Sequence, residues 1–209
     1  MVCFRFFSFL DLIVFIVFFF YGKSEKLYNI FLIPHTHLDA SWQYTFDEYF
    51  RYKVSNIYSE LISFLKYDYN VTFAICEISF FKRFYDESSN EIKERIKRRV
   101  LEGRIEFVNG GWVSNDEAIT YYSDIILQMR LGNEFILQEF NVIPKVAWNI
   151  DVLGHSNAMQ FLLSEMGFDY SFFTRDSDTE LRKQKGEMEF IWYPFYKHFN
   201  TNKAIFAHS

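Results

Sequence analysis

Short apolar runs alternate along the chain with longer segments in which apolar residues recur at helical spacing. The apolar runs predict strands, at residues 28–34, 71–75, 104–108, 145–150 and 170–174, with a sixth at 187–193. The helical spacing predicts helices, at residues 47–67, 79–101, 121–140 and 157–166. Strands that alternate with helices indicate a parallel sheet, and fully apolar runs such as IFLI fit strands that are buried on both faces. The predicted fold class is α/β, a parallel sheet with covering helices in one domain.

Composition narrows the class of protein. Hydrophobic residues make up 50% of the 209 residues and aromatic residues 22%, which excludes a disordered chain. The formal net charge is −5 with both signs spread along the sequence, so we expect no nucleic-acid partner. Cys3 and Cys76 are the two cysteines, and Cys3 lies in a segment that we expect to be removed. Cysteine count therefore says little about the redox compartment.

The N-terminal segment has the pattern of a secretory signal peptide over residues 1–24. Arg5 precedes an apolar stretch at 12–21, and Gly22-Lys23-Ser24 follows it. The alternative is an uncleaved membrane anchor, but Asp11 interrupts the apolar run. The sequon Asn70-Val71-Thr72 agrees with a secretory route. We expect no stable membrane association unless the segment stays uncleaved.

Polar and ionisable residues follow the predicted strands directly. In chain order they are His35, His37, Asp39 and Trp42; Glu77; Trp112, Asn115, Asp116 and Glu117; Asp151 and His155; and Arg175 and Asp176. In parallel α/β folds the ligand site lies at the carboxyl ends of the strands. The sequence therefore predicts a pocket at this edge of the sheet.

His37 and Asp39 form the first candidate pair. Residues two apart at an extended strand end project to the same side, and an imidazole with a carboxylate suits zinc. His35 has the same spacing to His37 and is an alternative ligand. The competing interpretation is that these histidines only satisfy buried polar groups at the strand end.

Asp151 directly follows a predicted buried strand. A carboxylate there can bind a metal or attack an electrophile. It could instead cap the next helix, although Ser156 or Asn157 could also serve as that cap. Trp42 lies in a polar loop where an aromatic face could cover a sugar ring. Arg175 could bind substrate oxygens, or pair with a neighbouring acidic residue such as Asp176.

Several ordered segments resemble the signature blocks of class II α-mannosidases, glycoside hydrolase family 38. The blocks are IPHTHLDASW (33–42), EISFFKRF (77–84), NGGWVSNDEA (109–118), WNIDVLGHS (148–156) and GFDYSFFTR (167–175). The resemblance runs from about residue 29 to 193, and the lysosomal branch is the most similar. It implies an incomplete barrel-like N-terminal catalytic domain at residues 25–209.

What the resemblance implies is a zinc-dependent retaining exo-α-mannosidase acting on terminal α-mannose of glycoprotein glycans. In the family's pattern, His37, Asp39 and Asp151 bind Zn²⁺, and Asp151 is also the catalytic nucleophile. Trp42 and Arg175 line the mannose subsite. The implied partner is a mannose-containing oligosaccharide, and the implied location is the secretory pathway, in the lysosome or outside the cell, with the Golgi lumen as the alternative.

The sequence departs from the family's pattern in places. Ser41 stands where the family has Gly, and Val152-Leu153 where it has Pro-Phe. The family's acid/base aspartate and its fourth zinc ligand, a histidine, belong to later segments, so we expect a chain truncated at its C-terminal end. The alternative function is therefore a catalytically inactive truncated product that at most binds zinc or mannose. A weaker alternative is another metal hydrolase acting on carbohydrate, such as a deacetylase.

Overall fold

A computed structural model describes residues 30–67, 70–118, 120–176, 178–195 and 203–209. The chain divides into one unit up to Leu32 and a second unit from Ile33 to Ser209. The signal peptide predicted at 1–24 lies outside the described residues. Among the residues that are described, no helix combines the length and the apolar character needed to cross a membrane.

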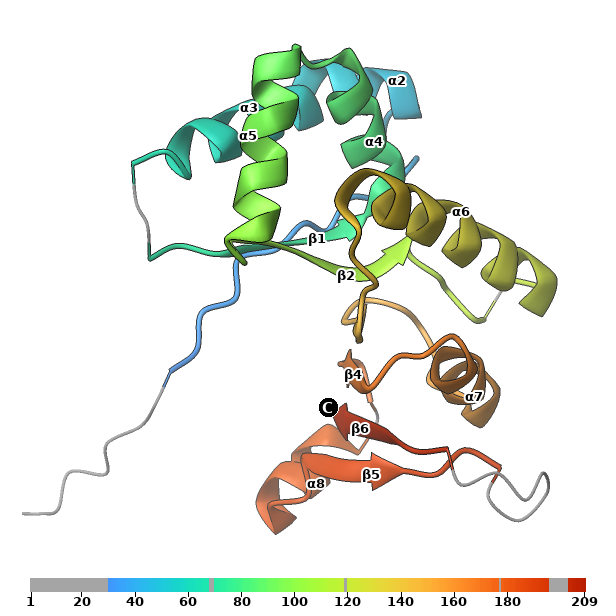
Figure 1. Cartoon of the computed structure of the whole chain (residues 1–209). Coiled ribbons are helices and arrows are strands. Elements are labelled where there is room, and N and C mark those ends of the chain that lie inside the picture. Colours follow the sequence, from blue (N-terminus) through green and yellow to red (C-terminus); the bar gives the residue numbers. More distant parts are fainter. Residues whose placement is uncertain (1–29, 68–69, 119, 177, 196–202) are drawn as a thin grey trace, which may run out of the picture. The chain divides into compact units, whose positions relative to one another are not determined.

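The parallel strands follow one another through the second unit in chain order (Figure 1). β1 (Phe73–Glu77) pairs in parallel with β2 (Ile105–Gly111). β3 (Val146–Asn149) pairs in parallel with β4 (Tyr170–Phe173), and β4 with β6 (Ile205–His208). This order is typical of a sheet wound in one direction, so the predicted parallel α/β fold is confirmed, without closure into a barrel among the described strands.

The two sets of strands meet at Asn109 in β2. Its side-chain amide donates to the Trp148 carbonyl and accepts from the Trp148 N–H, both at 2.7 Å. One side chain thus replaces the backbone hydrogen bonds that would otherwise join β2 to β3. Asn109 and Gly110 have positive φ angles, and the pairing of β1 with β2 shifts in register there, as in a β-bulge.

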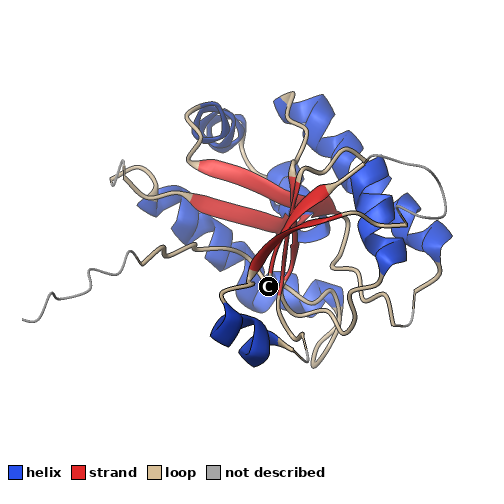
Figure 2. Ribbon diagram, turned by 90° about the horizontal axis from the view of Figure 1, so that it is seen from below, coloured by secondary structure: helices blue, strands red, loops and turns tan. Residues whose placement is uncertain are grey.

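Helices surround these strands (Figure 2). They are α2 (Phe46–Tyr49), the π-helix η1 (Phe50–Val54), α3 (Ser55–Phe64), α4 (Ile78–Glu87), α5 (Asn90–Leu101), α6 (Tyr122–Phe140), α7 (Asn157–Glu165) and α8 (Thr179–Lys185). The larger core lies between β1, β2 and helices α3 to α6, and aromatic rings fill it. Phe81 lies 5.4 Å from Phe107 and 5.6 Å from Tyr58, ring centre to ring centre. Much of the unusual aromatic content is therefore core.

The first predicted strand and the second predicted helix differ from the structure. The strand expected at 28–34 does not form at residues 30–34; pairing occurs later, through a single bridge between His35 and Ala74. That register puts Ile33 opposite Thr72, one residue before β1 begins. The helix expected at 79–101 is two helices, because Ser89 caps α5 by accepting the Ile92 N–H.

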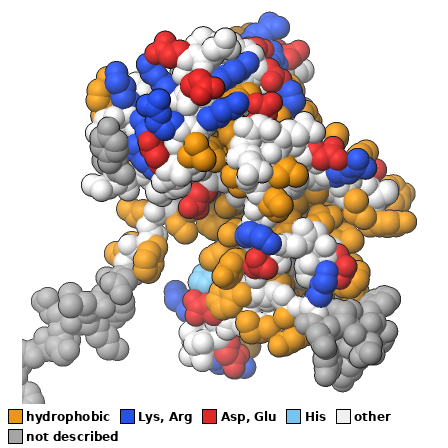
Figure 3. Space-filling view, in the orientation of Figure 1, with side chains coloured by type: hydrophobic (Ala, Val, Ile, Leu, Met, Phe, Trp, Pro, Cys, Tyr) orange, Lys and Arg blue, Asp and Glu red, His pale blue; other side chains and the backbone are white. Residues whose placement is uncertain are grey.

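The last predicted strand, 187–193, forms as β5 (Glu189–Trp192) but runs antiparallel to β6. The predicted parallel sheet therefore carries one antiparallel strand at its edge, where β5 pairs with β6. Figure 3 shows acidic and basic side chains mixed over the helical part of this face. On α5 they form ion pairs such as Arg95–Glu91, as a solvated helix face does.

Candidate functional site

Three of the predicted site residues meet at the carboxyl ends of the strands. His37 Nε2 lies 2.9 Å from Asp151 Oδ2. Arg175 Nε donates to Asp151 Oδ1 at 2.5 Å, and its Nη2 contacts the same oxygen. The residues come from three separate loops, after the bridge at His35, after β3 and after β4. The predicted gathering of polar groups at this edge is therefore present for these three.

Local structure explains how each side chain reaches this point. Hydrogen bonds between Thr36 N–H and Ala74 O, 3.0 Å, and between Ala74 N–H and Pro34 O, 2.9 Å, hold the chain just before His37 against β1. Arg175 adopts a positive φ of 59°, which turns the chain sharply after β4. Ser156 caps α7 through the Met159 N–H, 3.1 Å, so Asp151 is not used as the helix cap.

The loop after β3 is fastened on two sides. The Ser156 N–H donates to a Glu117 carboxylate oxygen at 2.9 Å, which ties this loop to the one after β2. His155 Nε2 lies 2.6 Å from the Thr174 carbonyl, and the Thr174 hydroxyl donates to the Ile150 carbonyl. Asp151 therefore lies in a loop whose backbone is held from both neighbouring strand ends.

The electrostatics favour an ionised Asp151. The hydrogen bond from Arg175 has the largest effect and lowers the pKa of Asp151 below its ordinary value. Burial opposes it, and the hydrogen bond of His37 and the charges of Arg175 and His37 lower the pKa further. The side chains of His37 and Asp151 are 34% and 41% exposed, so a ligand can reach both. The arrangement provides an accessible carboxylate that is negatively charged at neutral pH.

The remaining predicted residues are placed less closely. Trp42 is 75% exposed in the loop that follows His37 and Asp39, and Asp39 is also exposed. Over the described stretches of the chain, no three His, Cys, Asp or Glu side chains gather tightly enough to hold a metal ion. His35, the alternative ligand, has Nδ1 2.8 Å from the Thr36 carbonyl and its ring against Trp148. The structure thus joins His37 to Asp151 but does not join Asp39 to them.

The donor types and the spacing of the joined pair fit zinc. Two ligands bound tetrahedrally at about 2.0–2.1 Å from zinc stand roughly 3.3 Å apart, close to the separation of His37 Nε2 and Asp151 Oδ2. Asp39, two residues from His37, is the third donor that the sequence offers. His37 and Asp151 therefore fit a zinc ion, whereas the side chain of Asp39 would have to turn toward them.

Two further residues at this edge of the sheet, Glu77 and Asn109, have structural roles that the sequence did not predict. Glu77 is only 1% exposed at the end of β1, and Asn109 joins β2 to β3. Glu77 was recognisable as a strand-end carboxylate, but its burial was not, and the register of β1 against β2 shifts just before it. The Asn109-Gly110-Gly111 run signals an unusual backbone, although not the strand that the side chain would contact.

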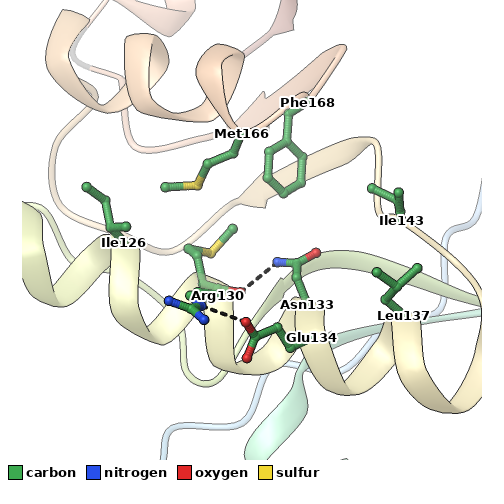
Figure 4. A pocket seen from close by; sticks show the side chains of 9 residues that line it. Ile126, Arg130, Asn133, Glu134, Leu137, Ile143, Met166 and Phe168 are labelled. Atoms are coloured by element: carbon green, nitrogen blue, oxygen red, sulfur yellow. Dashed lines mark hydrogen bonds and ion pairs between the residues drawn. The ribbon is translucent and has the colours of Figure 1, made fainter.

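A cavity of about 300 Å³ lies elsewhere, between α6 and the residues before β3 and β4 (Figure 4). Its walls are mainly apolar and include Met129, Ile143 and Phe168. Its charged members, Arg130 and Glu134, pair with each other at 2.6 Å. Because Ile143 and Phe168 precede β3 and β4, the cavity lies at the amino ends of these strands, away from Asp151. The cavity is therefore separate from the candidate site at Asp151.

Comparisons with known proteins agree with this geometry. A family model described as Glycosyl hydrolases family 38 N-terminal domain matches residues 27–209. The lysosomal alpha-mannosidase of Homo sapiens is 42% identical over 182 residues, which are 81% of this chain and 18% of that protein. The alpha-mannosidase of Canavalia ensiformis is 38% identical over 199 residues, 90% of this chain and 20% of that protein.

Solved structures share the fold at low identity. An alpha-mannosidase from Enterococcus faecalis V583 matches with a TM-score of 0.66 and 14% identity, over 84% of this chain and 19% of that one. A 4-alpha-glucanotransferase from Thermococcus litoralis matches with a TM-score of 0.61 and 13% identity, over 86% of this chain and 27% of that one. The chain spans about a fifth of the length of the two curated relatives described above.

Proposed function

The chain belongs to glycosyl hydrolase family 38, and from that premise we propose that it is part of a zinc-dependent, retaining exo-α-mannosidase. The substrate would be terminal α-mannose on glycoprotein glycans. The observation that carries the proposal is the convergence of His37 and Arg175 on the two carboxylate oxygens of Asp151. A retaining glycosidase needs such an ionised, accessible carboxylate as its nucleophile.

Asp151 would attack the anomeric carbon of mannose and form a covalent mannosyl ester, which water then hydrolyses. Arg175 keeps the pKa of Asp151 low and fixes one of its oxygens, so that the other is directed toward His37. Trp42 offers an exposed aromatic face to the sugar ring.

His37, Asp39 and Asp151 would hold the zinc ion. When bound, zinc would supply a positive charge that polarises and orients sugar hydroxyls. The accessibility of His37 and Asp151 and their spacing support this assignment.

A covalent trap tests the nucleophile directly. An activated fluorinated α-mannosyl donor has a leaving group that departs without an acid, so it reports on Asp151 alone. We expect mass spectrometry of the full chain, loaded with zinc, to find one sugar on the peptide that contains Asp151. Asp151→Asn should abolish the label, whereas Asp176→Asn, which removes a strand-end carboxylate paired with Arg182 at 3.0 Å, should keep it.

The same experiment separates the alternatives. A chain that binds zinc but is never labelled would be the inactive product that at most binds zinc or mannose. Label on another residue, or release of acetate from an acetylated sugar without any label, would contradict the nucleophilic role of Asp151 and favour a deacetylase.

We further propose that the protein enters the secretory pathway and acts in the lysosome. The N-terminal pattern at 1–24 and the lysosomal alpha-mannosidase of Homo sapiens, 42% identical, support this. Asn70 and Thr72 of the sequon are both exposed, which a glycan acceptor requires. Expression in a secreting eukaryotic cell should give a chain whose mobility changes on glycosidase treatment, and Asn70→Gln should remove that change.

A further inference from the structure

Glu77 is a buried carboxylate at the edge of the candidate site. It ends β1 and is 1% exposed. The Ser114 hydroxyl, from the loop after β2, donates to its Oε1 at 3.2 Å. Its Oε2 is buried and has no partner in good hydrogen-bond geometry. A charged side chain in this position is one that folding alone would not favour.

The surroundings of Glu77 act on its pKa in opposite directions. Burial raises the pKa of Glu77 above its ordinary value. The Thr36 hydroxyl, the Leu38 N–H, the charge of His37 and the Ser114 hydroxyl act against that rise. A neutral side chain of similar size would avoid the free-energy cost of burying a charge and would not need these polar groups to offset it. Some other requirement therefore has to account for the carboxylate.

The groups that face Glu77 indicate what that requirement is. Thr36 and Leu38 flank His37 on either side. Thr36 is 4% exposed and its hydroxyl oxygen accepts the Cys76 N–H at 2.8 Å, so it is anchored to β1 next to Glu77. The Leu38 N–H, two residues further along the chain, also acts on the Glu77 carboxylate and lowers its pKa.

We propose that Glu77 is a positioning residue, which holds the backbone on both sides of His37 and so directs the His37 imidazole toward Asp151. The proposal rests on the proposed function in one respect, that the His37–Asp151 pair binds zinc. Glu77 itself touches neither substrate nor metal in this role; it acts through Thr36 and Leu38.

Amide hydrogen exchange in the metal-free full chain tests the contact independently of function. Glu77→Leu removes both carboxylate oxygens that face the Leu38 N–H, so the Leu38 amide should exchange about twofold faster or more, the low end of what the loss of a hydrogen bond gives. Glu77→Gln keeps the shape but only one acceptor oxygen, and should give an intermediate rate. Tyr58→Phe is the matched control, because the Tyr58 hydroxyl is buried without a partner and lies within the electrostatic reach of Glu77.

Zinc affinity is the second measurement, made with zinc alone by competition with a chelator. Loss of a group that orients a ligand typically weakens metal binding about 10–100-fold. We expect a loss in that range for Glu77→Leu, a smaller loss for Glu77→Gln, and none for Tyr58→Phe. The thermal midpoint of Glu77→Gln should equal or exceed that of the wild type. Weaker binding with undiminished stability is a combination that a merely structural role would not give.

The outcomes are separable. Unchanged Leu38 exchange in both Glu77 variants would overturn the positioning role, whatever the zinc result. Unchanged zinc affinity in both variants of a zinc-binding chain would overturn it as well. Faster exchange in a chain whose wild type binds no zinc would support the backbone contact while rejecting the proposed zinc function. If Glu77→Leu does not fold, Glu77→Gln alone decides through the same two measurements.

Discussion

The two oxygens of Asp151 are engaged by different side chains, one by Arg175 and the other by His37. A carboxylate held in this way stays ionised and keeps a fixed direction, which both a nucleophile and a metal ligand require. Exposed ion pairs contribute little to stability, so the value of this triad lies in the site rather than in the fold.

A comparison of the two neighbouring histidines tests the ligand assignment. His37→Ala removes the ring beside Asp151 and should weaken zinc binding by at least about tenfold, the effect of losing one direct ligand. His35→Ala should leave zinc affinity nearly unchanged, because its Nδ1 faces the Thr36 carbonyl. The measurement is chelator competition on folded protein. Equal losses in the two variants would show that the ligand has been misassigned.

Glu77 should also leave a signature in the pH dependence of stability. Its pKa in the folded chain is raised above the ordinary value of 4.5, so the folded state holds its proton more tightly than the unfolded state. The stability that this provides is fully present below the unfolded pKa and is lost as pH rises through the folded pKa. Urea unfolding of the wild type and Glu77→Gln across that range should show the advantage of the variant growing with pH; a constant difference would contradict this.

Sequence reasoning could place His37, Asp151 and Arg175 on one edge because each follows a predicted strand, and parallel strands end together. It could not show that Asp39 would remain apart from them, because two residues of loop allow many side-chain directions. An ion pair of Arg175 with a neighbouring acidic residue was one of two interpretations; in the structure Asp176 pairs with Arg182, and Arg175 pairs with Asp151. Long-range partners of this kind depend on loop conformations that periodicity does not encode.

At the scale of elements, α6 packs so closely on β2 that only glycine fits at their contact. A Cβ at Gly132 would overlap the Gly110 carbonyl oxygen. Gly132→Ala should therefore destabilise the chain by about 1–3 kcal/mol despite the better helix propensity of alanine. Gly103→Ala is the control: it meets nothing within 4 Å, and its φ of +67° should cost only about 1–2 kcal/mol.

Chemical denaturation measures the free energy of unfolding of both glycine variants. The Gly132 variant should also lower zinc affinity, because moving β2 disturbs the bulge near Glu77, whereas the Gly103 variant should not. A Gly132 variant with wild-type stability would mean that α6 can shift away from the sheet without loss.

Asn109 is the other element-scale contact, because its amide completes two hydrogen bonds to Trp148. Asn109→Asp keeps the acceptor but places an oxygen opposite the Trp148 carbonyl, and should destabilise the fold by about 1–3 kcal/mol. Asn109→Gly loses both hydrogen bonds but relieves the positive φ of 57°, which separates the two effects. Urea unfolding measures both; equal stability of wild type and Asn109→Asp would show that the amide bridge contributes nothing.

Most elements were predictable because the helical spacing of apolar residues in helices differs clearly from the short apolar runs of the strands. α6 and β4, for example, begin and end close to the expected residues. The direction of β5 was not, because a half-exposed strand has the same alternation whether it runs parallel or antiparallel. α8 and β6 were not predicted either. α8 is short and strongly charged, and β6 at the end of the chain is only four residues long.

At the scale of the whole molecule, Cys76 reports on the integrity of the sheet. It lies in β1, is 3% exposed, and burial raises its thiol pKa well above the ordinary value. In a Cys3→Ser background, a thiol reagent should react with Cys76 only as fast as the fold opens, so labelling should accelerate with urea in step with unfolding. Rapid labelling of the native chain would show that β1 separates locally.

The Asn109 bridge has a mechanical consequence. His37 lies beside β1, and Asp151 follows β3, on the other side of the contact between β2 and β3. The two sets of strands can therefore separate with the loss of few hydrogen bonds. A ligand bound to both residues would link the two sets of strands. Its affinity would therefore depend on how stably these two sets of strands pack against each other.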